Sequence, residues 1–283
     1  YITNNGISQE KLKLVLIDPK KVEFTPYHKI PHLISPVISD AVEAAKALKV
    51  IVMMMENRYE IFSKAGVRNI QTYNELLQKN TDPTLEPMPW IVVIIDELAD
   101  LMIVAGKEVE ASIQRITQLA RAAGIHLIVA TQRPSTDVIT GIIKANIPSR
   151  IAFAVSSGID SRTIIDGVGA ERLLGYGDML FFPVGEPAPV RVQGVYVTDE
   201  EIRRVTDFVN QQQKPQFDDA FLNLNESEGS TQGGTSSEDP LFEEVKNYII
   251  ETGRASTSNI QRRFGLGYNR AARLIDILEE QGV

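Results

Sequence analysis

Short apolar runs that alternate with longer amphipathic stretches constrain the fold of this chain most strongly. The run Ile91–Ile95 is uniformly apolar and is closed by Asp96 and Glu97. A second short run, Leu12–Ile17, is closed by Asp18 in the same way. A strand without polar alternation is typically buried on both faces, as in a parallel sheet. The sequence therefore predicts an α/β fold whose mainly parallel sheet is covered on both sides.

The remaining elements follow the same alternation. Helical spacing of apolar residues predicts helices over Asp40–Ala65 and Glu108–Ala123, each followed by a glycine that ends it. Further strands are predicted at His126–Ala130, at Ile151–Val155 and, at an edge, at Val190–Val197. Because strands and helices alternate throughout this part, residues 1–210 are predicted to form one domain.

A polar segment, residues 211–239, separates this domain from a second one. It is rich in Gln, Ser and Gly and holds −5 of the chain's net charge of −8, so a flexible acidic linker is predicted. Residues 240–283 are neutral overall and have the size of a helix-turn-helix unit. The helical segments predicted there are Pro240–Thr252, Thr257–Arg263 and Tyr268–Glu280. Because the acidity is concentrated in the linker, the net charge does not exclude DNA as a partner.

Composition removes several classes of site. The 283 residues contain no cysteine, which excludes a disulfide scaffold, thiolate zinc sites and a thiol nucleophile. The three histidines, His28, His32 and His126, are too few and too scattered to indicate a metal site. No apolar run approaches the roughly 18 residues that a membrane-spanning helix needs.

The strongest functional signal in the residues themselves is the pair Asp96-Glu97. An acidic residue at the carboxyl end of a buried strand can hold Mg²⁺, and a following glutamate can orient or deprotonate an attacking water. Thr131 and Gln132 end the neighbouring predicted strand, where a polar tip can sense a terminal phosphate. The alternatives are an acidic pair that caps the next helix and a proline-terminated loop without chemistry.

Such a site normally relies on a P-loop, G-x-x-x-x-G-K-[ST], to cradle the phosphates. The chain's single Gly-Lys pair, Gly106-Lys107, is followed by Glu108 and lacks the earlier glycine. The motif is therefore absent from these 283 residues.

Several stretches resemble the FtsK/SpoIIIE family of DNA translocases. They are LVLIDPK at 14–20, YEIFSKAGVRNIQTYN at 59–74, VVIIDELAD at 92–100, ARAAGIHLIVATQRP at 120–134, DVITGIIKANI at 137–147 and GYGDML at 175–180. Residues 241–282 are similar to the same family's C-terminal winged-helix (gamma) domain, through IQRR at 260–263 and GYNRAAR at 267–273. The resemblance implies a RecA-like motor domain at 1–210 that lacks its P-loop segment, and a winged-helix domain at 240–283 that lacks its wing.

Roles at the nucleotide follow from this resemblance position by position. Asp96 matches the family's Walker B aspartate, Glu97 its catalytic glutamate and Gln132 its sensor. Arg121 matches an arginine finger that reaches the ATP site of a neighbouring subunit; without the resemblance it would be a cation at a helix end. ATP and Mg²⁺ are implied as cofactors, and Asp96 would share the metal with a P-loop Ser/Thr that this chain does not contain.

Implied DNA contacts lie in both domains. Arg133 and Lys144 match basic residues on loops that line the pore of the family's hexamer. Gly158 stands where some members have a third basic residue, so it is not counted as a contact. In the small domain the implied base-reading positions are Asn269, Arg273 and Asp276 (a glutamate in the family), and the implied phosphate contacts are Arg262, Arg263 and Arg270.

For the complete protein, the resemblance implies a homo-hexameric, ATP-driven double-stranded DNA translocase for chromosome segregation at cell division or sporulation. It also implies membrane attachment through N-terminal segments that this chain lacks, a cytoplasmic position at the division septum of a bacterial inner-membrane protein, and a site-specific recombinase as a partner of the C-terminal domain. The alternatives are a conjugative coupling or DNA-packaging ATPase and a non-hydrolysing DNA-binding assembly module. Without a P-loop, the chain alone is expected not to hydrolyse ATP.

Overall fold

The computed structural model describes residues 10–79, 86–222, 224, 242–252 and 263–264. The chain divides into two compact units, Tyr1–Leu222 and Asn223–Val283, which are described separately. Within the described ranges no helix is long and apolar enough to cross a membrane.

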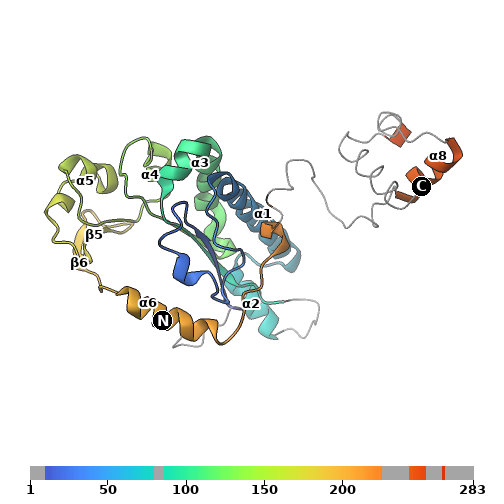
Figure 1. Cartoon of the computed structure of the whole chain (residues 1–283), viewed down its shortest axis with the longest axis horizontal. Helices are drawn as coiled ribbons and strands as arrows, with labels where there is room; N and C mark the ends of the chain where they lie inside the picture. Colours follow the sequence, from blue (N-terminus) through green and yellow to red (C-terminus); the bar gives the residue numbers. More distant parts are fainter. Residues whose placement is uncertain (1–9, 80–85, 223, 225–241, 253–262, 265–283) are drawn as a thin grey trace. The chain divides into compact units, whose positions relative to one another are not determined.

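Figure 1 traces the elements along the chain. In the first unit they are β1 (Leu12–Ile17), the 3₁₀ turn η1 (Thr25–Tyr27), α1 (Ala41–Ala65), α2 (Ile70–Lys79), β2 (Trp90–Ile95), α3 (Leu98–Ala123), β3 (Ile125–Val129), α4 (Gly141–Asn146), β4 (Arg150–Ala152), α5 (Gly158–Ile165), the 3₁₀ turn η2 (Ala170–Arg172), β5 (Asp178–Phe182), β6 (Val190–Gln193), α6 (Asp199–Asn210) and α7 (Asp219–Leu222). The second unit contains α8 (Phe242–Thr252).

The predicted parallel sheet is confirmed for its first three strands, which lie in the order β1-β2-β3. The register pairs Ile17 with Ile95 and Ile95 with Val129, so the three strands end side by side. Residues that directly follow parallel strands therefore meet at one edge of the sheet. This arrangement brings Asp18 and Asp96 to the same edge.

The predicted fourth and fifth strands belong to a second, antiparallel sheet instead of extending the parallel one. The fourth is β4, which ends at Ala152 where the prediction ran to Val155, and the fifth is β6, which ends at Gln193 where it ran to Val197. Between them lies β5, a strand that the sequence analysis does not predict, and it pairs with both. The carboxylate of Asp178, at the start of β5, accepts two hydrogen bonds from the Arg191 guanidinium on β6, at 2.8 and 2.9 Å.

Both faces of the parallel sheet are covered over β1 and β2, as predicted, whereas His126 and Ile128 leave one face of β3 exposed. One face packs against the segment around η1 and against α6, in a cluster formed by Leu14, Leu16, Ile30, Leu33 and Val209. Because side chains alternate along a strand, Val15 and Val93 point to the opposite face, and both are fully buried. On that side lie α1 and α3, which pack along each other (Figure 1).

The ends of the long helices follow local signals. Asp40 caps α1, because its Oδ1 accepts hydrogen bonds from the backbone N–H groups of Val42 and Glu43, each at 2.9 Å. Gly124 ends α3 with a φ of 72°, and a Cβ at this position would lie 2.5 Å from the Ile70 side chain. Only glycine therefore allows the chain to turn here from α3 into β3.

Part of the predicted linker packs on the first unit. Phe217 joins the cluster beside α6, and Phe221 in α7 is buried. The backbone N–H of Asp218 donates to the carbonyl of Ile34 at 2.8 Å. These contacts place the end of the first unit beyond residue 210, at Leu222. Of the predicted linker, residues 223 and 225–239 lie outside the described residues.

The second unit is described mainly through α8, which covers the first of its three predicted helices. The ring of Tyr248 on α8 meets the ring of Phe264 edge to face, with centroids 5.7 Å apart. The other two predicted helices lie outside the described residues, except for Arg263.

Candidate functional site

Glu97 lies at the edge where the parallel strands end, and its side chain is fully buried. It caps α3, because Oε1 accepts a hydrogen bond from the backbone N–H of Ala99 at 3.3 Å. The same oxygen accepts hydrogen bonds from the hydroxyl of Thr131 and from the backbone N–H of Gln132, at 2.5 and 3.2 Å. Glu97 therefore caps the next helix, which is the alternative role that the sequence analysis gives for the acidic pair. It also connects the end of β2 to the polar residues that follow β3. The cap also explains why α3 begins at Leu98, ten residues before the predicted start.

A lysine that the sequence analysis does not single out completes this cluster. Lys20 Nζ lies 2.9 Å from Oε2 of Glu97 and 3.2 Å from Oε1 of Gln132. Lys20 follows β1 as Glu97 follows β2, so the parallel sheet brings the two residues to the same edge. Its position after a buried strand is the local signal in the sequence, and a plain turn would give the same signal.

Asp18 holds the turn that carries Lys20. Its side chain is buried, its Oδ1 accepts from the backbone N–H of Lys20 at 3.1 Å, and its Oδ2 accepts from that of Phe24 at 3.0 Å. Because both oxygens are bonded to the backbone, Asp18 has a structural role in this cluster.

Glu97 is held in the ionised form. Burial alone would raise the pKa of Glu97. Hydrogen bonds from the Thr131 hydroxyl and the Lys20 ammonium, with two backbone N–H groups, outweigh burial and lower that pKa below its ordinary value. The result is a buried carboxylate with fixed donors around it, aimed at the tip of the neighbouring strand.

Asp96 has the opposite electrostatic environment. Burial raises the pKa of Asp96, and the carboxylates of Asp18, Glu23 and Glu97 raise it further, with Lys20 opposing them. Its Oδ2 is buried and has no hydrogen-bond partner among the described residues. An unsatisfied carboxylate oxygen among negative charges fits a cation. The described residues form no group of three or more metal-ligating His, Cys, Asp or Glu.

Arg121 is not part of this cluster. It is exposed in the last turn of α3, at the edge where β3 begins, and it lines a cavity of about 490 Å³ with Tyr59, Trp90 and His126. The six residues of β2 separate this edge from Asp96 by about 20 Å, at roughly 3.3 Å per residue. Arg121 therefore does not reach the Asp96 edge of its own chain.

The two predicted pore residues are both paired with carboxylates. Arg133 follows β3, is mostly exposed, and lies 3.8 Å from Asp100 of α3. Lys144 lies on the short helix α4 and forms an ion pair with Asp166, which also binds Arg150. Any contact between Lys144 and DNA would have to compete with Asp166.

The implied DNA-reading residues of the small domain lie mostly outside the described residues. These are Arg262, Asn269, Arg270, Arg273 and Asp276. Arg263 is described and is exposed, as a phosphate contact requires.

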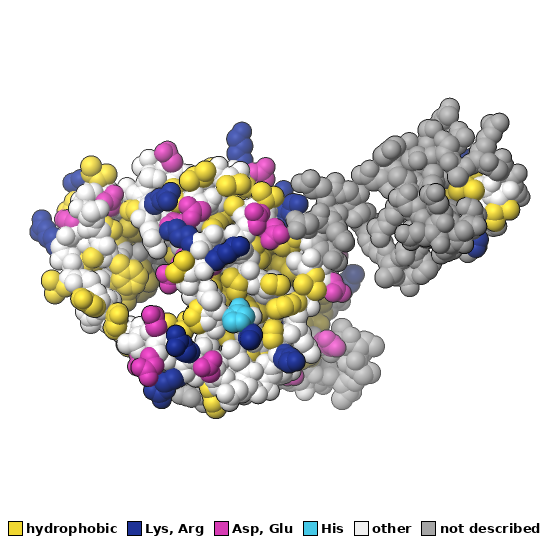
Figure 2. Space-filling model, viewed as in Figure 1, with side chains coloured by type: hydrophobic (Ala, Val, Ile, Leu, Met, Phe, Trp, Pro, Cys, Tyr) yellow, Lys and Arg dark blue, Asp and Glu magenta, His cyan; other side chains and the backbone are white. Residues whose placement is uncertain are grey.

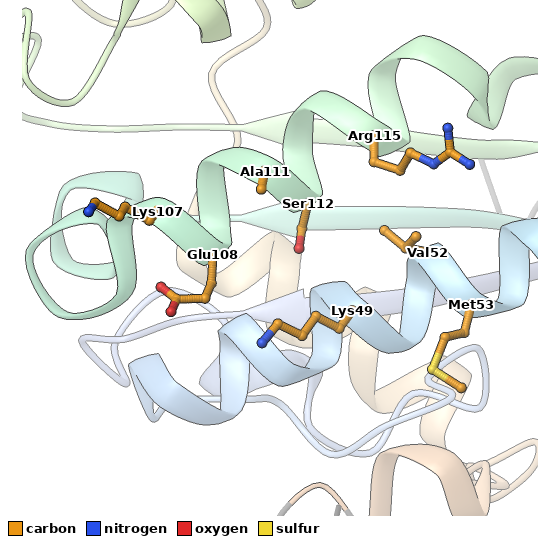
Figure 3. A pocket seen from close by; sticks show the side chains of 8 residues that line it. All are labelled: Lys49, Val52, Met53, Lys107, Glu108, Ala111, Ser112 and Arg115. Atoms are coloured by element: carbon orange, nitrogen blue, oxygen red, sulfur yellow. The ribbon is translucent and has the colours of Figure 1, made fainter. Parts of the chain in front are cut away.

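A groove between α1 and α3 contains none of the predicted site residues (Figure 3). It has a volume of about 490 Å³, and Lys49, Met53 and Lys107 are among its lining residues. Arg115 borders it and pairs with Glu56 at 2.9 Å. The predicted nucleotide-site residues Asp96, Glu97 and Gln132 therefore lie at the edge of the sheet and not in this groove.

Two family descriptions match this chain. The FtsK/SpoIIIE family matches residues 8–136, which contain Lys20, Asp96, Glu97 and Gln132. The FtsK gamma domain matches residues 236–283.

Curated relatives agree with these matches. The DNA translocase FtsK of Streptococcus pyogenes serotype M3 (strain SSI-1) is 54% identical over 281 residues, covering 97% of this chain and 35% of the relative. The DNA translocase SpoIIIE of Bacillus subtilis (strain 168) is 54% identical over 276 residues, covering 96% of this chain and 35% of the relative. The chain thus spans about a third of the length of these relatives.

Solved structures share the fold. The pCW3 conjugation coupling protein TcpA, in its monomer form with ATPγS, has a TM-score of 0.60 and 27% identity, over 72% of this chain and 57% of TcpA. The cytoplasmic domain of the Thermomonospora curvata type VII secretion ATPase EccC has a TM-score of 0.60 and 21% identity, over 75% of this chain and 26% of EccC. Two family matches, together with 54% identity over nearly all of its residues, show that this chain belongs to the FtsK/SpoIIIE family and carries an FtsK gamma domain.

Proposed function

We propose that this chain is a part of the motor, with the orienting domain, of an ATP-driven double-stranded DNA translocase that segregates chromosomes at cell division or sporulation. The observation that carries the proposal is the cluster at the end of β2. There the buried, ionised Glu97 stands beside Asp96 and contacts the Thr131-Gln132 tip of β3. In phosphoryl transfer such a glutamate orients the attacking water, and a polar sensor on the adjacent strand faces the terminal phosphate.

ATP and Mg²⁺ belong to the same proposal. The unsatisfied Oδ2 of Asp96 suits a magnesium ligand, to be shared with a P-loop Ser/Thr outside these 283 residues. β3 is the last strand of the parallel sheet and carries the exposed Ile128, which supports a P-loop strand added at that edge. With the phosphate cradle supplied by that segment, the chain alone is expected to hydrolyse little ATP.

A homo-hexamer would complete each site. Arg121 is exposed and far from the acidic edge of its own chain, as an arginine finger that acts on a neighbour requires. Large apolar side chains are also exposed around α5, β5 and β6, where Figure 2 shows yellow surface. They include Ile159, Val168, Leu174, Tyr176 and Val195. Exposed apolar surface of this kind supports a subunit interface.

The proposed substrate is double-stranded DNA, along which the motor would translocate. Arg133 and Lys144 would grip phosphates without reading bases, because a translocase must accept any sequence. The gamma domain would read sequence and set direction. Attachment to the bacterial inner membrane through segments outside this chain, a cytoplasmic place at the septum and a recombinase partner of the gamma domain complete the proposal for the whole protein.

The test uses the complete protein with its P-loop, in an assay where translocation displaces a triplex-forming strand from duplex DNA. Glu97→Gln should bind ATP and DNA but stop hydrolysis and displacement. Glu108→Gln is the matched control, because Glu108 is an exposed glutamate of α3 outside the cluster. Displacement by Glu97→Gln at the rate of the unaltered protein would remove Glu97 from the reaction.

A conjugative coupling ATPase is the second candidate, favoured by the likeness to TcpA. The two candidates differ in the role of the gamma domain. Removing residues 240–283 from the complete protein should abolish any preference for the direction set by a strand-skewed motif if the protein segregates chromosomes. A coupling ATPase would show no such preference with or without these residues. Absence of hydrolysis in the complete protein would favour a DNA-binding assembly module.

A further inference from the structure

We propose that Lys20 is a positioning residue whose ammonium occupies Oε2 of Glu97 while no DNA is bound; this contact is called the latch. When DNA binds Arg133, Lys20 leaves Oε2, so that ATP turnover depends on DNA. This inference rests on the proposed function and names a residue that regulates the same site. It is carried by the contacts of Glu97 and of the three consecutive residues that follow β3.

The first step concerns which oxygen of Glu97 can receive a water. Oε1 already accepts hydrogen bonds from Thr131, Gln132 and Ala99. Oε2 has Lys20 as its near partner at 2.9 Å, with only a longer contact from the Gln132 N–H at 3.3 Å. Because the glutamate is fully buried, a water that is to be oriented by Glu97 needs the position beside Oε2 that the ammonium now holds.

The second step is that Lys20 can leave without refolding the turn. Its backbone is fixed by Asp18, whose Oδ1 accepts the Lys20 N–H. Its side chain, by contrast, is 30% exposed and reaches Glu97 from the solvent side. The ammonium can therefore move into water while the turn stays in place.

The third step links the latch to DNA. Thr131 donates to Glu97 and accepts the backbone N–H of Arg133 at 3.1 Å. Gln132 holds Lys20 through its side-chain oxygen at 3.2 Å. Arg133 itself is 59% exposed, and its 3.8 Å pair with Asp100 is long enough for a phosphate to replace it. Movement of Arg133 towards a phosphate would shift the same three-residue segment that holds both Glu97 and Lys20.

The first measurement is ATP hydrolysis by the complete protein, with and without duplex DNA. Lys20→Met should raise the DNA-free rate several-fold and lower the stimulation by DNA. Lys20→Arg should keep the low DNA-free rate, because it retains a cation at Oε2. Lys21→Met is the matched control, since it removes the same charge from an exposed neighbour and should leave both rates unchanged.

The second measurement does not depend on turnover. If DNA binding must open the latch, removing the latch tightens DNA binding, because coupling between two sites is reciprocal. Without nucleotide, Lys20→Met should therefore bind a random duplex several-fold more tightly in an anisotropy titration, although it loses a positive charge. Lys21→Met should bind equally or more weakly. In an Arg133→Ala background, Lys20→Met should no longer tighten binding.

An unchanged or lower DNA-free rate in Lys20→Met, or DNA binding weakened as in Lys21→Met, would overturn the latch. If Lys20→Met does not fold, Lys20→Gln makes the same comparison, since it also removes the charge. Failure of the proposed function has a different signature: the unaltered complete protein would show neither DNA-stimulated hydrolysis nor triplex displacement.

Discussion

Arg121 and Asp96 lie at opposite ends of the parallel strands. Asp96 directly follows the last residue of β2, whereas Arg121 lies near the start of β3. Helix α3 begins two residues after Asp96 and carries Arg121 in its last turn. The separation of about 20 Å follows from the length of β2. A direct role for Arg121 in hydrolysis therefore requires a second subunit.

Complementation between subunits tests this consequence. Complete subunits carrying Arg121→Ala, mixed with subunits that lack the P-loop lysine, should recover part of the ATPase activity that each lacks alone. In the proposed hexamer, mixing would restore interfaces that join an intact P-loop to an intact finger. The measurement is hydrolysis across mixing ratios, with mixed assembly confirmed by native mass spectrometry. Strictly additive activity at every ratio would show that Arg121 is not the finger.

Lys144 offers a test of the pore assignment, because Asp166 competes for its ammonium. Lys144→Ala should weaken binding to any duplex and reduce the salt slope by about one unit. Asp166→Asn should instead tighten binding, since it frees Lys144. Arg150 should stay in place in that variant, because carbonyls of Ile147 and Ile164 also hold it, each at 3.3 Å.

Anisotropy titrations of random duplexes over a range of salt concentrations measure both effects. Lys107→Ala is the matched control, since Lys107 is an exposed lysine that borders the groove between α1 and α3. Weaker binding by Asp166→Asn would mean that Asp166 positions Lys144 for DNA and does not compete with it. A loss confined to one DNA sequence would contradict the phosphate role.

The ion pair between Asp178 and Arg191 predicts a pH-dependent contribution to stability. The Arg191 guanidinium, with the Leu174 backbone N–H, lowers the pKa of Asp178 to about 2. A lowered carboxyl pKa adds stability above the ordinary pKa, and this addition is lost as the pH falls from about 4 towards 2. Asp178→Asn should therefore lower the melting temperature clearly at pH 7 and much less near pH 2.5.

Circular dichroism melts of the two proteins at both pH values make the comparison. Exposed Asp137→Asn serves as a control and should melt like the unaltered chain at each pH. An equal gap between Asp178→Asn and the unaltered chain at both pH values would place the cause in packing and not in the ionised pair.

The acidic edge could be predicted from sequence because its signals are local. An apolar run closed by Asp96-Glu97 needs only neighbours along the chain to be recognised, and a parallel register then brings Gln132 beside it. Lys20 could not be predicted in this way. Its partner Glu97 is 77 residues away, and Asp-Pro-Lys after a strand is equally typical of a plain turn.

The elements that the sequence analysis does not predict depend on contacts between residues that are far apart in the sequence. A charged first residue weakens the strand signal of β5, and Arg191, the partner of Asp178, lies 13 residues away. In the predicted linker, average composition conceals the partly buried Phe217 and the buried Phe221, whose packing ties residues 211–222 to the first unit. The start of α3 was obscured by Gly106, where the helix continues past a kink at Ala105.

The last prediction concerns DNA reading by the gamma domain. A helix over Tyr268–Glu280 would place Ala271, Leu274, Ile275 and Leu278 on its apolar stripe and Asn269, Arg273 and Asp276 on another face. In the major groove Arg can bind guanine O6 and N7, Asn can pair with adenine, and a carboxylate can accept from cytosine N4. Asp276 is one methylene shorter than a glutamate, so Arg273 is the better position to test.

Arg273→Ala in the complete protein should cost about 1–3 kcal/mol of binding on a strand-skewed guide motif and little on a random duplex. Arg263→Ala is the matched control, because a phosphate contact should weaken binding to both duplexes alike. The same result is expected for Arg262 and Arg270. Anisotropy titrations of the two duplexes at one salt concentration give the comparison. Equal losses on both duplexes for Arg273→Ala would reduce Arg273 to a phosphate contact and remove orientation reading from this helix.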